Sequence, residues 1–227
     1  MNTDLELIGA TLVTIAAAIA LTIVGPRELD WLPDGFEKPV LALELVRTPQ
    51  DFHNMASQTA LQPPQSSAHD RYRLNTLIDF GFIAAYAFLW AAILRQIPGT
   101  PGLAGVTLVL AAACADIVED VGILYGLRAD LPGVQIVRTI RSAALVKWGL
   151  LGVAFLLLAY RFRPGREVRD GWQLWSAAIA LAYAYGGVLC LVGLFHNPVI
   201  ERSALPIGAA LLMQIALFWH ERRADAR

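Results

Sequence analysis

Charged side chains are scarce in this chain. Asp, Glu, Lys and Arg make up 16% of its 227 residues, whereas hydrophobic residues make up 56%. A soluble globular domain typically carries about 25% charged residues, so this composition is typical of a protein that lies in lipid. The formal net charge of −1 also provides no basic surface, and we expect no nucleic-acid partner.

Cysteine and the common cofactor motifs are scarce as well. Cys114 and Cys190 both lie inside apolar stretches, where we expect buried small hydrophobic side chains rather than a disulfide. The sequence has no HxxxH, HExxH or CxxC spacing, no GxxxxGK[ST] or GxGxxG fingerprint, and no haem-type histidine pair inside an apolar stretch. The sequence therefore has no nucleotide or haem signature, and it assigns no catalytic residue.

Long apolar stretches are what the chain has instead. A bilayer is crossed by about 20 predominantly apolar residues in a helix, and six stretches approach or exceed that length. The sequence therefore predicts an all-α polytopic membrane bundle, formed by residues 1–227 as one membrane domain. The six predicted spans are Leu5–Val24, Leu74–Ile97, Leu103–Leu127, Arg141–Tyr160, Trp172–Phe195 and Ser203–Trp219.

The orientation is predicted from basic residues in short loops, which favour the cytoplasmic side. Arginines gather in the link between the fourth and fifth spans and in the C-terminal tail, at Arg161, Arg163, Arg166, Arg169, Arg222, Arg223 and Arg227. We therefore expect the protein to lie in the inner (plasma) membrane of a bacterium, with both termini in the cytoplasm. Arginines at the opposite ends of the spans argue against that orientation, at Arg71, Arg73, Arg128, Arg138 and Arg141.

The one long connection, residues 25–73, predicts a cap made of two short helices and a linker. Phe36–Val46 is mostly apolar but carries Glu44, and Thr48 followed by Pro49 is typical of an N-cap that opens a second helix. Residues 62–67 form a Pro- and Ser-rich linker into the second span. Such a connection can serve as a lid over a site, or it can be an interfacial amphipathic segment that only shields the bundle.

Three carboxyl groups interrupt the third span. Asp116, Glu119 and Asp120 are spaced by three and four residues, which places them on one helical face. An ionised Asp near the bilayer midplane costs about 3 kcal/mol or more, so such a group must be protonated, paired, hydrated or bound to a cation.

Two more ionisable residues fall at the same depth in neighbouring spans. Asp79, the pair Glu119 and Asp120, and Lys147 each lie roughly 9 to 11 Å inside the same membrane face, counted at 1.5 Å per residue. We therefore expect one polar site in the non-cytoplasmic half, with Lys147 as counter-ion to a surplus of acids. Two simpler interpretations remain: Lys147 extends to the interface along its apolar stem, and Asp79 pairs with Arg73 near the helix start.

Polar residues at the mouth of this site are candidates for its rim, and two of them are histidines that are also candidates for metal ligands. The rim candidates are Glu44, His53, Arg138, Arg141, His196 and Asn197. Carboxylates with histidines could hold a divalent cation, for which the candidates are Asp116, Asp120, His53 and His196.

Three functions fit this pattern. The first is binding or transport of a proton, a cation or a cationic amphiphile in the carboxylate-rich site. The second is a membrane enzyme that acts on a lipid headgroup, possible with or without a metal. The third is a structural subunit whose acids pair with a basic span of a partner chain. The expected partners are accordingly membrane lipid and a second copy or a partner membrane subunit.

Overall fold

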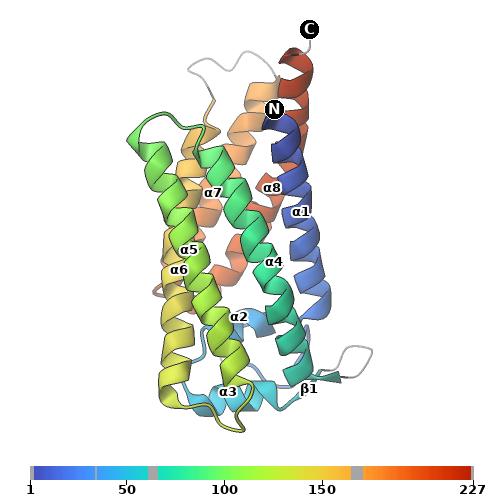
Figure 1. Ribbon diagram of the computed structural model, residues 1–227, viewed down its shortest axis with the longest axis vertical. Helices are drawn as coiled ribbons and strands as arrows, with labels where there is room; N and C mark the ends of the chain where they lie inside the picture. The colour runs from blue at the N-terminus through green and yellow to red at the C-terminus, as the bar shows by residue number, and fades with distance from the viewer. Residues whose placement is uncertain (1–2, 34, 61–65, 165–170, 226–227) are drawn as a thin grey trace.

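The computed structural model describes residues 3–33, 35–60, 66–164 and 171–225, and these residues form a helical bundle (Figure 1). Six of its helices are long and apolar enough to cross a membrane, which confirms the all-α prediction and fits an integral membrane protein. These are α1 Thr3–Val24, α4 Ala68–Leu94, α5 Thr100–Gly126, α6 Val134–Arg161, α7 Gly171–Gly193 and α8 Ala204–Asp225.

The six long helices form a closed ring in the order α1, α4, α5, α6, α7, α8, in which α8 packs against α1 again. Both chain ends lie at one end of the bundle, and the helices of the long connection lie at the other (Figure 1). This arrangement agrees with the predicted alternation of the spans. Three of the arginines on which the predicted orientation rests lie outside the described residues: Arg166, Arg169 and Arg227.

The connection between α1 and α4 folds into a cap under the bundle. It contains α2 Pro39–Glu44, α3 Pro49–Ala56 and a short antiparallel pair, β1 Thr59–Ala60 with β2 Ser66–Ser67. Thr48 is the N-cap of α3 as predicted, since its side chain accepts a hydrogen bond from the Asp51 amide at 3.1 Å. The predicted helix Phe36–Val46 is too long, because Pro39 starts it and the chain leaves helical geometry at Leu45. Residues 62–65 of the linker lie outside the described residues.

The cap is held to the bundle at several points. Tyr72 donates its hydroxyl to the Pro39 carbonyl at 3.1 Å, and Arg141 donates to the Leu45 carbonyl at 2.8 Å. Phe52 and Met55 are buried in the cluster that joins the cap to α4, α5 and α6. The cap therefore packs against the bundle and closes one end of it.

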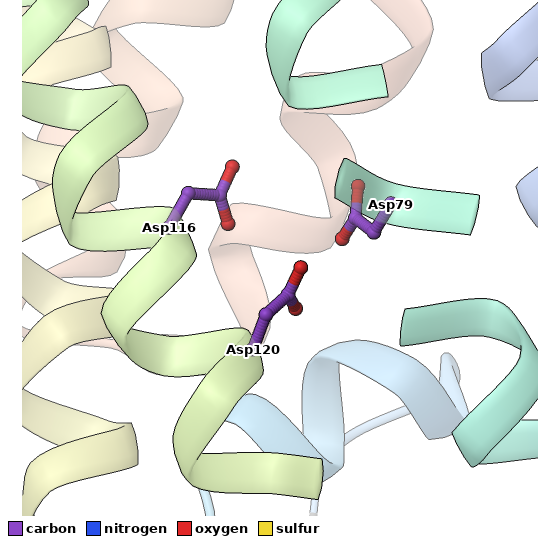
Figure 2. A group of neighbouring side chains, drawn as sticks. All are labelled: Asp79, Asp116 and Asp120. Carbon is purple, nitrogen blue, oxygen red and sulfur yellow. The ribbon is translucent and has the colours of Figure 1, made fainter. Parts of the chain in front are cut away.

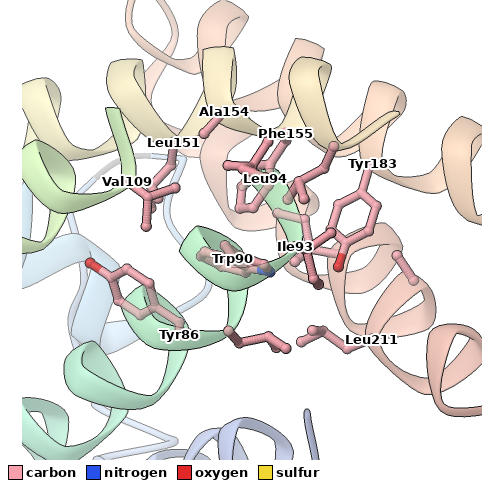
Figure 3. Close-up of a cluster of buried hydrophobic side chains, with 14 of the residues drawn as sticks. Tyr86, Trp90, Ile93, Leu94, Val109, Leu151, Ala154, Phe155, Tyr183 and Leu211 are labelled. Atoms are coloured by element: carbon pink, nitrogen blue, oxygen red, sulfur yellow. The ribbon is translucent and has the colours of Figure 1, made fainter. Parts of the chain in front are cut away.

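The end of the bundle away from the cap is filled by an apolar, aromatic core (Figure 3). Trp90 meets Phe155 edge to face with 4.8 Å between ring centroids, and Phe155 stacks with Tyr183 at 5.9 Å. Trp90 is 3% exposed, although tryptophans of membrane helices are often interfacial anchors. Its helix face points into the ring of helices, so the indole packs in the core instead of reaching a headgroup region.

Helices α6 and α7 pack closely through a pair of glycines. A Cβ atom on Gly187 would lie 2.8 Å from the Gly152 carbonyl oxygen, and a Cβ atom on Gly152 would lie 3.1 Å from the Gly187 carbonyl oxygen. Small residues commonly allow this backbone approach between membrane helices. The obstacle is backbone, so a methyl group there must push the helices apart.

We therefore predict that Gly187→Ala destabilises the protein by about 1–3 kcal/mol, the usual range for overpacking. Gly208→Ala in α8 is the matched control, because a Cβ atom there has no heavy atom within 4 Å. Thermal unfolding in detergent measures both variants. Equal melting temperatures for the two would contradict the close approach of α6 and α7.

Candidate functional site

A cluster of carboxyl groups, four of them buried and that of Asp79 partly exposed, surrounds one lysine where the cap meets the bundle. Helix α2 supplies Glu44, α4 supplies Asp79, and α6 supplies Lys147. The remaining three acids come from one face of α5. We call the set the carboxylate site: Glu44, Asp79, Asp116, Glu119, Asp120 and Lys147. The structure thus brings together all five residues of the predicted site and adds Glu44 from the predicted rim.

Lys147 is the centre of the site. Its Nζ lies 3.0 Å from Glu44 Oε2, 2.9 Å from Asp116 Oδ1 and 2.9 Å from Glu119 Oε2. The residue is 4% exposed, so the alternative in which Lys147 extends to the membrane interface is wrong. An ammonium group has three N–H donors, and three carboxylates already lie against it.

Two aromatic side chains orient these carboxylates. Tyr86 donates its hydroxyl to Asp116 Oδ2 at 2.9 Å, and Trp148 donates its indole N–H to Glu44 Oε2 at 3.4 Å. Neither of these two hydrogen bonds to the carboxylates was predicted from the sequence. Tyr86 follows Asp79 by seven residues, two turns along the same face of α4, and that spacing could have linked it to the site.

Asp79, Asp116 and Asp120 form the second half of the site and point toward one another (Figure 2). One carboxylate oxygen from each lies within 4.8 Å of the others. Asp120 is 2% exposed, and its Oδ2 has no hydrogen-bond partner among the described residues. Neither Asp79 nor Asp120 forms an ion pair with Lys147, and Asp79 forms none with Arg73 in the described part of the chain. These two carboxyl groups therefore lack a positive counter-charge.

Arg141 and Asn197 lie near the site but do not supply that charge. Besides its hydrogen bond to the cap, Arg141 contacts the side-chain amide of Asn197. With the amide oxygen turned toward the guanidinium, that oxygen accepts hydrogen bonds from both Nη atoms of Arg141 at 3.2 Å. Asn197 opens the short 3-10 helix η1 Asn197–Ser203. Within η1, the Glu201 carboxylate accepts from the backbone amides of Glu37 and Lys38 at 2.8 to 3.1 Å. The predicted rim here ties the cap, α6 and η1 together.

The other rim candidates point away from the acids. His53 contacts the backbone carbonyl of Asp130, and His196 is exposed ahead of η1. Arg138 is exposed on the outer face of α6. His53 follows Phe52, which occupies the buried face of α3, so the helix turns His53 outward. The metal-type group formed by the described residues joins Asp116 and Asp120 with Asp79, and it contains neither His53 nor His196.

The chain matches no protein-family model, no curated protein and no solved structure. The function of the site is therefore argued from its own chemistry.

The ion pairs of Lys147 predict a specific pattern of stability. Lys147→Met leaves three buried carboxylates without their counter-ion, which should cost about 3–5 kcal/mol. Adding Glu119→Gln removes one of those carboxylates, so the double variant should be more stable than the sum of the two single losses predicts. Unfolding of the purified protein in detergent measures the loss of stability in the two single variants and in the double variant.

Lys38→Met is the matched control, because Lys38 is exposed and is the only other lysine in the chain. It should change the stability by less than about 0.5 kcal/mol. Strictly additive losses at Lys147 and Glu119 would mean that the two side chains do not interact.

Proposed function

We propose that this membrane protein binds a cation, or protons in its place, between Asp79, Asp116 and Asp120. One observation carries the proposal: Lys147 Nζ already forms ion pairs with Glu44, Asp116 and Glu119, and Asp79 and Asp120 are left without a positive partner. Buried carboxylates in a low-dielectric bundle require compensation, which only a proton or a bound cation can give here.

The positions of the acids support a binding role over a purely structural one. An acid that served only to fix helices would have its oxygens hydrogen-bonded, whereas Asp120 Oδ2 is buried without a partner. Acids that paired with a basic span of a partner chain would face outward. Asp116, Glu119 and Asp120 instead point into the ring of helices and are at most 4% exposed.

The spacing of the oxygens suits a hard cation of moderate size. Ca²⁺ binds oxygen ligands at about 2.3–2.6 Å, so oxygens on opposite sides of it lie up to about 5 Å apart. The three carboxylates, with oxygens within 4.8 Å of one another, fit that limit. Mg²⁺ binds at about 2.0–2.1 Å and would require the group to contract.

The surroundings favour an ion over a larger substrate. On one side the cap closes the site through Glu44, and on the other Tyr86 and Trp90 pack with 5.0 Å between ring centroids. Movement of the cap would open this side of the site to the aqueous phase, as in a carrier that occludes its ion. The enzyme hypothesis needs an opening for a lipid headgroup, and the groove between α5 and α6 does not supply it, because none of the six residues of the carboxylate site lines that groove.

The test is the thermal stability of the full-length protein in detergent as a function of added cation and of pH. A ligand that binds only the folded state stabilises it by about 2.7 kcal/mol at a hundred times its dissociation constant. Wild type should therefore melt at a higher temperature with Ca²⁺ or Mn²⁺ than with equal ionic strength of Na⁺. Asp120→Asn keeps the shape of the side chain and should remove this response without unfolding the protein.

Asp130→Asn is the matched control, since Asp130 is an exposed acid in the loop between α5 and α6 and should respond as wild type does. A response to pH but to no cation would identify the ligand as protons. If wild type responds to neither, or if Asp120→Asn responds as wild type does, the carboxylate site is structural and the proposal is overturned.

A further inference from the structure

The outer surface of the bundle has a groove between α5 and α6, with a volume of about 470 Å³. Its walls are mostly small or apolar, and they include Cys114, Ala115 and Val118 from α5 and Val146 from α6. Exposed apolar residues adjoin it on the same helices, among them Ile117, Val121 and Val134. The groove is shallow and opens onto the apolar outer surface of the bundle, which in a bilayer suits an acyl chain.

One end of the groove is polar. Arg138 and Ser142 line it one turn apart on α6, both side chains are exposed, and neither forms a hydrogen bond or ion pair with any described residue. Thr139 beside them differs, because its hydroxyl donates to the Gln135 carbonyl at 2.9 Å. A guanidinium and a hydroxyl thus remain available to a molecule in the groove.

We propose that this groove binds one anionic phospholipid, with its phosphate on Arg138 and an acyl chain along α5 and α6. Arg138 comes four residues after the start of α6, roughly 6 Å along the axis, which is a depth suited to a headgroup. The guanidinium fork matches a phosphate, and the Ser142 hydroxyl donates to an ester carbonyl of the glycerol. From Arg138 the groove continues roughly 12 Å toward Val146, the direction in which an acyl chain enters the bilayer.

A second copy of the chain fits the groove less well. A two-fold dimer places the same patch on both sides of the interface, so each Arg138 would approach its counterpart. No acidic residue lines the groove to offset that repulsion. The proposal is independent of the cation site, because the groove and the carboxylate site use opposite faces of α5.

The experiment compares lipid binding by the purified full-length protein in a neutral detergent. Native mass spectrometry counts retained lipid, and thermal unfolding measures its effect on stability, with added phosphatidylglycerol or phosphatidylcholine of equal chain length. Wild type should bind phosphatidylglycerol about tenfold more tightly than phosphatidylcholine, the effect of one charge-assisted contact. Arg138→Gln should abolish that preference.

Arg128→Gln is the matched control, because it removes the same charge from another exposed arginine near the cap and should keep the preference. Ala115→Phe fills the groove and should weaken retention of both lipids, which tests the path of the acyl chain. Inorganic phosphate should not displace phosphatidylglycerol; displacement would show an anion site without a lipid.

Three further outcomes would overturn the proposal. They are equal retention of the two lipids by wild type, an identical loss in Arg138→Gln and Arg128→Gln, and a dimer that Ala115→Phe converts to a monomer. The last outcome would assign the groove to a second copy.

Discussion

The bundle depends on the placement of one ammonium group. Lys147 of α6 lies within 3.0 Å of carboxylates from α2 and α5, so a single side chain joins the cap to two membrane helices. Such a buried group is strongly destabilising when any one partner is missing. The six residues of the carboxylate site therefore have to be considered as a unit, in which the position of each acid depends on the others.

Because three carboxylates already form ion pairs with Lys147, the site divides into two halves that share Asp116. One oxygen of Asp116 pairs with Lys147, and the other accepts from Tyr86. Asp116 is also one of the three ligand candidates on the other side, with Asp79 and Asp120. A cation held there would compete with Lys147 for Asp116. Occupancy of one half thus changes the charge balance of the other, including the pair that Lys147 makes with Glu44 of the cap.

Much of this architecture could be predicted from the sequence because its signals are periodic. Apolar length defines the spans, and the spacing of Asp116, Glu119 and Asp120 defines one face of α5. The equal depth of Asp79 and Lys147 follows from counting residues along alternating helices. What could not be predicted are the tertiary contacts, because the periodic spacing of residues along a helix does not specify them. Helical position alone does not show that Glu44 enters the site while Arg141 turns to the Leu45 carbonyl, or that Trp90 packs inward.

Helix α5 shows how a membrane helix can serve two environments at once. Its inner face carries the acids, of which Asp116 is compensated by Lys147 and Tyr86, and Glu119 by Lys147. Its outer face carries Cys114, Ala115 and Val118, which are small enough to leave a groove against α6. The two faces share one backbone. A shift of α5 that loosened the ion pairs of Lys147 would also change the width of the groove, because both faces move with the same helix.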